Sequence, residues 1–118
     1  MGSVATAASF AEREAQRAGW SEPALSRLVL AVTEATSNAV EHGAGDLYVS
    51  CACTAGRCDV VVADDGAGPS RSDVSRADVL PPTQSLHGRG LYILRQLSDT
   101  LHFEGSTLSI TVVRAPGP

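Results

Sequence analysis

The sequence contains no lysine, since all nine of its Lys and Arg residues are arginine. A P-loop nucleotide site needs a lysine on the β- and γ-phosphates, and Schiff-base enzymes need an amine nucleophile. The absence of lysine excludes both chemistries for this chain acting alone. The formal net charge of -4 also argues against a nucleic-acid partner, because affinity for DNA comes largely from clustered lysine and arginine.

Long apolar runs and aromatic residues are also scarce. No stretch approaches the roughly 18 consecutive apolar residues of a membrane span, and no basic segment precedes an apolar one at the N-terminus. We therefore expect a cytoplasmic protein without membrane contact. Aromatic residues make up 4% and hydrophobic residues 43%, so the core should consist mainly of valine, leucine and alanine. The length of 118 residues predicts a single domain over residues 1–118.

Cysteine is limited to Cys51, Cys53 and Cys58, too few for the disulfide framework of a small secreted protein. Cys51 and Cys53 are two residues apart, so they are expected on the same face of a strand. We expect them to be reduced and to pack as small hydrophobic side chains. A zinc site with His102 as the fourth ligand is the alternative.

Hydrophobic periodicity predicts two helices at the start of the chain. Alanines at helical spacing predict a first helix over residues 4–18. A longer helix is expected over residues 22–42, capped by Ser21 and stopped by Gly43. Its middle, residues 28–32, is apolar nearly all round, which predicts burial on most sides.

Alternating patterns predict two hairpins, one joining residues 46–54 to 58–64 and the other joining 101–104 to 108–114. Between them lie a long loop, residues 65–86, and a third helix that starts near Gly88. Short connections imply antiparallel pairing. The expected fold class is α+β: a two-layer sandwich with a mostly antiparallel sheet and helices on one face.

The long helix carries a polar pair of chemical interest. Glu34 and Asn38 lie one turn apart, so their side chains project together. A carboxylate beside an amide oxygen suits Mg²⁺ together with proton transfer. An exposed polar stripe is the alternative interpretation of the same spacing.

Two glycine-rich segments follow. Asp64 is expected on the inward face at a strand end, where its carboxylate could accept a hydrogen bond from the exocyclic amine of adenine; an ordinary glycine-rich turn is the alternative. Gly88, Arg89 and Gly90 open the third helix, whose backbone N–H groups could hold an anion. A simple loop-to-helix transition has the same composition.

Taken together, these segments resemble the N, G1 and G2 boxes of the Bergerat-fold (histidine-kinase-like) ATPases, in that order. The matching segments are Glu34 to His42, Asp64 to Gly68, and Gly88 to Leu91. Within that superfamily the chain is most similar to the anti-sigma-factor serine/threonine kinases, in which Glu-Ala-x-x-Asn-Ala-x-x-His is typical. The resemblance extends from the first helix to Arg114.

The resemblance implies a role for each matching residue. Glu34 would be the catalytic base, Asn38 would coordinate the Mg²⁺ that bridges the ATP phosphates, and Asp64 would bind the adenine amino group. Residues 69–87 would form a lid over the nucleotide. The implied nucleotide-binding residues are Asn38, His42, Asp64, Gly66, Gly68, Gly88, Arg89, Gly90, Leu91 and Ser106.

As a function, the resemblance implies an ATP-dependent protein serine/threonine kinase that regulates transcription. It would phosphorylate a STAS-type anti-sigma antagonist and sequester a sigma factor. The alternatives are an ATP-dependent protein-binding module without kinase activity and a detached ATP-binding domain of a histidine kinase. The family usually begins with a strand, which we expect to be absent here. Either this sequence starts after that strand, or the sheet edge is completed otherwise, by a partner or in a homodimer.

Overall fold

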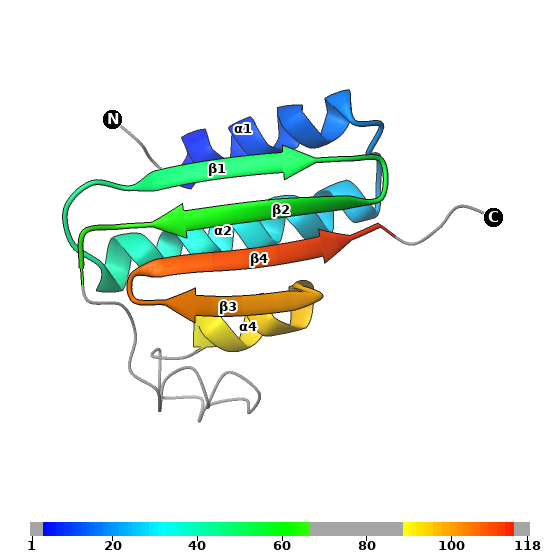
Figure 1. Cartoon of the computed structure of the whole chain (residues 1–118). Coiled ribbons are helices and arrows are strands. Elements are labelled where there is room, and N and C mark those ends of the chain that lie inside the picture. Colours follow the sequence, from blue (N-terminus) through cyan, green and yellow to red (C-terminus); the bar gives the residue numbers. More distant parts are fainter. Residues whose placement is uncertain (1–3, 67–88, 115–118) are drawn as a thin grey trace.

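The computed structural model describes residues 4–66 and 89–114, which form a sheet of four strands and a layer of helices (Figure 1). The elements are α1 (Val4–Arg17), α2 (Ala24–His42), β1 (Tyr48–Cys53), β2 (Arg57–Ala63), α4 (Arg89–Leu97), β3 (Thr100–Glu104) and β4 (Thr107–Val113). The strand order is β1-β2-β4-β3, and every neighbouring pair is antiparallel. The α+β sandwich expected from the sequence is confirmed.

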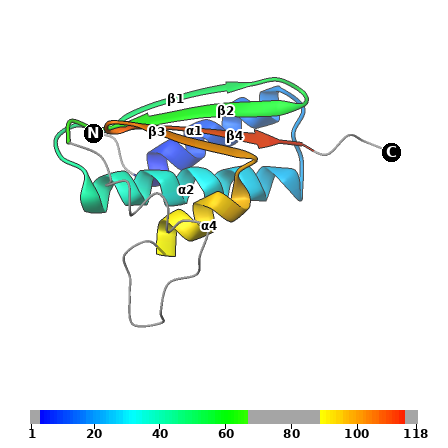
Figure 2. The same cartoon turned by 60° about the horizontal axis from the view of Figure 1, so that its bottom comes forward.

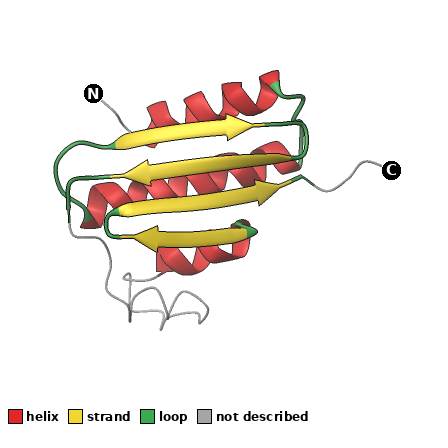
Figure 3. Cartoon of the chain, in the orientation of Figure 1, coloured by secondary structure: helices red, strands yellow, loops and turns green. Residues whose placement is uncertain are grey.

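The described helices all cover the same face of the sheet (Figures 2 and 3). Side chains on the two central strands alternate in burial, because successive residues of a strand point to opposite faces. The antiparallel register places Val60 opposite Ile110 and Val62 opposite Leu108. These four side chains are buried and form the sheet side of the core.

Helix α2 lies at the centre of the helix layer. Leu28, Ala31 and Val32 are fully buried, whereas Leu30 is 45% exposed. The expectation that residues 28–32 are buried on most sides is therefore wrong for Leu30. The sheet covers one side of α2 and the helices α1 and α4 pack on its flanks, which leaves a fourth side exposed. None of the described helices is long and apolar enough to cross a membrane.

The start of α2 also differs from the sequence expectation. The helix begins at Ala24, and its N-cap, Pro23, makes no capping hydrogen bond through a side chain. Ser21 contributes its backbone carbonyl, which accepts the N–H of Leu25 at 3.0 Å. The Glu22 carboxylate accepts the N–H of Ser26 at 2.7 Å. The capping group is therefore a carboxylate, which the positive end of the helix dipole favours.

Arg27 joins the first half of α2 to the end of β4. Its Nη2 lies 3.4 Å from Oδ2 of Asp99 and donates to the carbonyl oxygen of Val113. The same Asp99 oxygen accepts the N–H of Val113 at 2.6 Å. Asp99 lies between α4 and β3, so the flank of α2 that carries Arg27 is the one that faces α4.

The cysteines differ from the expected reduced state. Cys53 and Cys58 face each other across the first hairpin, with Cα atoms 4.1 Å apart, and form a disulfide. The hairpin register causes this, because it places the two side chains directly opposite on the helix-facing side. Cys51 is free. His102 lies on the exposed face of β3, across β4 from β2, so it cannot complete a zinc site with these cysteines.

Two leucines of α2 test the observed burial. We expect Leu28→Ala to lower the free energy of unfolding by about 2–5 kcal/mol, because it leaves a cavity in the core. Leu30→Ala is the matched control and should change it by less than about 1 kcal/mol. Urea unfolding followed by circular dichroism measures both. Equal losses for the two variants would show that the orientation of α2 is wrong.

Candidate functional site

The C-terminus of α2 lies against the end of β2. Gly43 caps the helix, and its N–H donates to the carbonyl oxygen of Ala39 at 2.8 Å. The Gly43 backbone is extended, a conformation that any residue can adopt. A Cβ at this position would overlap the carboxylate of Asp64 and the Ala39 carbonyl. Glycine is therefore required here because Asp64 approaches the backbone so closely.

Asp64 is held by groups from three parts of the chain. Its Oδ1 accepts the N–H of Gly66 at 2.6 Å and the N–H of Ala44 at 3.3 Å. The hydroxyl of Ser106, in the turn between β3 and β4, donates to the Asp64 carbonyl oxygen at 2.6 Å. Among the described residues, Oδ2 receives no hydrogen bond. The structure thus brings together Asp64, Gly66 and Ser106, three of the residues predicted to bind nucleotide.

The neighbouring Asp65 is a structural residue that the sequence analysis missed. Its Oδ2 accepts the N–H of Asp46 at 2.8 Å, and its own N–H donates to the carbonyl of Ala44 at 2.7 Å. Gly45 has a φ of +73°, and a Cβ there would overlap the Asp65 carboxylate. The available sequence signal was the pair of glycines, Gly43 and Gly45, directly after the long helix.

Glu34 and Asn38 lie on the flank of α2 that faces α4. Arg27 precedes Glu34 by about two helical turns and therefore lies on the same flank, and Arg27 contacts Asp99 just after α4. Both Glu34 and Asn38 are half-buried. Burial raises the pKa of Glu34 above its ordinary value, and the negative charge of Glu41 raises it further. A raised pKa suits a carboxylate that must accept a proton near neutral pH.

A cavity of about 530 Å³ opens beside the C-terminal turn of α2. It is lined by residues 39–40, residues 43–48 and Asp64. Glu34 and Asn38 are not among its lining residues, and no hydrogen bond between described residues joins either of them to Asp64. Among the described residues, the candidate site therefore consists of two separate groups. One is the Asp64 carboxylate, and the other is the polar flank of α2 with Glu34 and Asn38.

The other predicted residues lie at the edges of the described structure. His42 belongs to the last turn of α2, and Arg89, Gly90 and Leu91 belong to the first turn of α4. The start of α4 at Arg89 agrees with the predicted helix start near Gly88. Gly68, Gly88 and the expected lid, residues 69–87, lie outside the described residues.

Comparison with known proteins identifies the class. Residues 1–114 match the histidine kinase-like ATPase domain, and the chain belongs to that family. Similar curated proteins carry the name serine-protein kinase RsbW. Those of Bacillus cereus (strain AH187) and Bacillus anthracis (strain A0248) are 29% identical over 110 residues, which cover 82% of this chain and 69% of theirs. The protein of Bacillus mycoides (strain KBAB4) is 28% identical over the same shares. The resemblance found in the sequence is confirmed.

The close approach of Asp64 to Gly43 can be tested by adding one methyl group. We expect Gly43→Ala to lower the free energy of unfolding by about 1–3 kcal/mol, because the Asp64 carboxylate and the helix end must move apart. Gly56→Ala is the control, since no atom lies within 4 Å of the added Cβ, and it should change stability by no more than about 0.5 kcal/mol. Thermal unfolding of both variants measures the difference. A Gly43 variant as stable as the Gly56 variant would contradict the observed contact.

Proposed function

We propose that the chain is an ATP-binding protein serine/threonine kinase of the anti-sigma-factor type. The observation that carries this proposal is Asp64 at the end of β2, where the N–H groups of Gly66 and Ala44 hold its carboxylate and the Ser106 hydroxyl holds its backbone carbonyl. It occurs in a chain of the histidine kinase-like ATPase family with relatives named serine-protein kinases. The family supports ATP binding, and the names support transfer of phosphate to a protein hydroxyl.

Asp64 suits recognition of adenine for a chemical reason. Its Oδ1 already accepts two backbone hydrogen bonds, whereas Oδ2 takes none from the described residues, and Asp64 lines the cavity. An ionised carboxylate only accepts hydrogen bonds, so Oδ2 can bind the exocyclic amine of adenine. Guanine carries a carbonyl oxygen at the corresponding position, which would face the carboxylate with like charge. The proposed site should therefore favour ATP over GTP.

The polar flank of α2 suits the phosphates and the incoming hydroxyl. Asn38 and Glu34 offer hard oxygen donors one turn apart, the donor chemistry that Mg²⁺ prefers, and Asn38 would hold the ion. When bound, Mg²⁺ would neutralise phosphate charge, which phosphoryl transfer depends on. Glu34 would accept the proton of the attacking hydroxyl. The first turn of α4, with Arg89, would offer backbone N–H groups and a positive charge to the phosphates.

The proposed substrate hydroxyl belongs to a STAS-type anti-sigma antagonist, and the proposed regulatory partner is a sigma factor. The names of the relatives favour this role over that of a detached histidine-kinase domain. A protein-binding module without kinase activity would share the nucleotide site but transfer no phosphate. A homodimer or a partner strand along β1, an edge of the described sheet, remains a prediction.

Replacing Asp64 tests the adenine site. We expect Asp64→Ala to weaken ATP binding at least about 10-fold, because a hydrogen bond to a charged group is worth about 1.5–3 kcal/mol. The preference for ATP over GTP should shrink in the same variant. Isothermal titration with both nucleotides measures these changes.

The matched control is Asp59→Ala, because Asp59 lies on β2, which Asp64 directly follows, but pairs with Arg57 and Thr111. Asp59→Ala should bind ATP as the original chain does. Asp64→Asn is a second variant, since it keeps an oxygen for the N–H groups of Ala44 and Gly66 while removing the charge. Unchanged ATP affinity and nucleotide preference in both Asp64 variants would rule out the proposed adenine contact.

Replacing Glu34 tests the proposed base. We expect Glu34→Gln to slow phosphate transfer to a STAS-type antagonist by about 10²–10⁴-fold while ATP binding persists. The melting temperature at neutral pH should not fall. A carboxyl whose pKa is raised on folding costs stability above that pKa, and the neutral amide removes this cost. Labelled ATP with phosphosite mapping measures transfer, and calorimetry measures the melting temperature.

Glu41→Gln is the companion variant. It keeps Glu34 but removes the negative charge that raises the Glu34 pKa. The acidic limb of the rate–pH profile should therefore move to lower pH, with transfer retained. Phosphoserine or phosphothreonine formed by Glu34→Gln at the original rate would eliminate Glu34 as the base. ATP binding with no transfer by the unaltered chain to any STAS-type protein would favour the binding-module alternative.

A further inference from the structure

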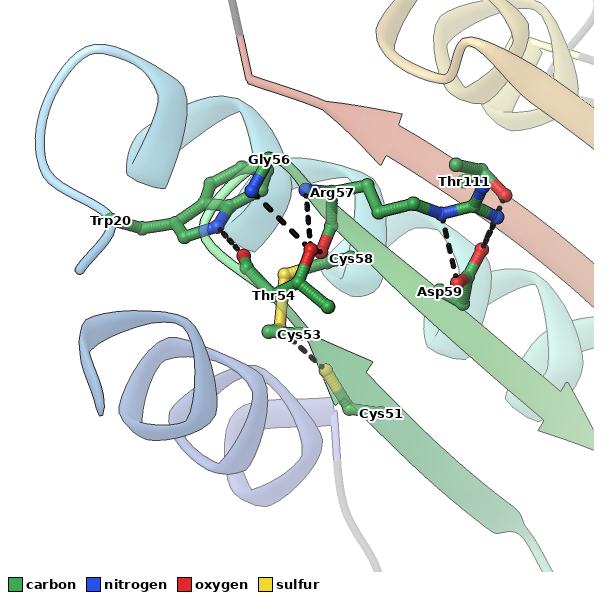
Figure 4. The surroundings of a disulfide bond; sticks show 9 residues. All are labelled: Trp20, Cys51, Cys53, Thr54, Gly56, Arg57, Cys58, Asp59 and Thr111. Carbon is green, nitrogen blue, oxygen red and sulfur yellow. Dashed lines mark hydrogen bonds and ion pairs between the residues drawn. A yellow bond between two sulfur atoms is a disulfide. The ribbon is translucent and has the colours of Figure 1, made fainter. Parts of the chain in front are cut away.

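The turn end of the first hairpin gathers all three cysteines of the chain (Figure 4). Cys53 and Cys58 are joined across β1 and β2, and Cys51 lies two residues earlier on the same face of β1. The Sγ atom of Cys51 lies 3.5 Å from that of Cys53, and all three Sγ atoms lie within 4.8 Å of one another. The proposed nucleotide site uses none of them.

A disulfide accounts for two of these sulfurs but not for Cys51. Burial raises the pKa of the Cys51 thiol to about 11, and the negative charges of Glu14 and Asp59 contribute. Glu14 and Asp59 are the acidic groups that act on this sulfur, and their negative charges would stabilise a cation bound there. The three sulfurs lie close enough together to be ligands of one ion.

The hairpin would keep the sulfurs together without the disulfide. The Oγ1 atom of Thr54 accepts the N–H groups of Gly56 and Arg57 at 3.3 and 3.2 Å, and the Thr54 N–H donates to the Arg57 carbonyl. The indole Nε1 of Trp20 donates to the Thr54 carbonyl at 2.7 Å. These contacts hold the turn and the β1–β2 register through groups that reduction does not change. The three thiols should therefore remain neighbours in the reduced protein.

The spacing of the sulfurs agrees with the geometry of a thiolate metal site. A zinc–sulfur bond of about 2.3 Å places ligand sulfurs roughly 4 Å apart. The Cys51 and Cys53 sulfurs are 3.5 Å apart, and reduction frees the bonded sulfurs of Cys53 and Cys58 to separate. Thiolate donors select soft or borderline ions and not Mg²⁺. A divalent ion with three thiolates leaves one net negative charge, whereas a monovalent ion would leave two beside Glu14. Charge therefore favours a divalent ion over Cu⁺, and Zn²⁺ is the divalent ion that thiolates commonly bind in proteins.

We propose that Cys51, Cys53 and Cys58 bind one Zn²⁺ ion when the Cys53–Cys58 disulfide is reduced. A dithiol reductant would supply two electrons and two protons to the disulfide and would itself become a disulfide. The two resulting thiols and the thiol of Cys51 release three protons as the three zinc–sulfur bonds form. Cys51 and Cys53 are only half-buried, so water can reach the fourth zinc position. The site is formed in the reduced protein and lost on oxidation.

Zinc binding by the full chain tests this proposal. The protein is reduced with a phosphine under anaerobic conditions and titrated with Zn²⁺ in competition with a chromophoric chelator. We expect one Zn²⁺ per reduced chain and none on the oxidised chain. Co²⁺ serves as a second probe, because three thiolates give it an intense sulfur-to-metal charge-transfer absorption. A reduced chain that binds neither ion overturns the proposal.

The decisive variant is Cys51→Ser, because it leaves the disulfide available and the oxidised protein can be checked for folding. Its zinc affinity should fall by at least about 100-fold, since losing even a group that only orients a ligand costs about 10–100-fold. Ala52→Ser is the matched control on the same strand, where it adds a hydroxyl to the exposed face, and its zinc affinity should not change. Should the oxidised Cys51→Ser protein fail to fold, Cys51→Ala takes its place. Equal affinities of the Cys51 variant and the control would overturn the assignment of Cys51 as a ligand.

Discussion

The carboxylates of Asp64 and Asp65 fix the connection between the long helix and the sheet, and the geometry of the candidate site depends on it. Asp64 accepts the N–H of Ala44, and Asp65 accepts the N–H of Asp46 and donates its own N–H to the Ala44 carbonyl. These backbone groups follow the end of α2 and lie beyond its helical hydrogen bonds. Two adjacent residues after β2 thus supply hydrogen-bond partners for the backbone of the loop that follows α2.

The rotation of α2 about its axis follows first from its apolar stripe, because Leu28, Ala31 and Val32 are buried while Leu30 is exposed. Polar contacts near both ends of the helix agree with this orientation. Arg27 contacts Asp99 and Val113 near the start, while the Asp64 carboxylate lies against Gly43 at the end. Glu34 lies between these two points. Its orientation toward α4, and with it the burial that raises its pKa, therefore follows from the buried apolar face of α2, with which the polar contacts at both ends agree.

Local patterns in the sequence predicted the order of the elements, the helix end at His42 and the inward placement of Asp64, because helix and strand periodicities are properties of neighbouring residues. Contacts between elements could not be predicted in this way. The need for glycine at Gly43 arises from the packing of β2 against α2. The Cys53–Cys58 disulfide depends on the hairpin register, which a shift of one residue would change. The exposure of Leu30 depends on how many sides of α2 its neighbours cover.

Charge determines how an ATP site could operate in a chain without lysine. The polar flank of α2 and the adjacent strand end carry Glu34, Glu41 and Asp64, and the triphosphate of ATP is itself negative. Two unit charges 4 Å apart interact by about 4 kcal/mol at the effective dielectric near a protein surface, more than the roughly 1 kcal/mol of a typical hydrogen bond. Within the three motif segments Arg89 is the one arginine. In the proposed site, backbone N–H groups and a cation held by Asn38 must therefore neutralise most of the phosphate charge. Asp64 must act at the adenine end of the nucleotide, away from the phosphates.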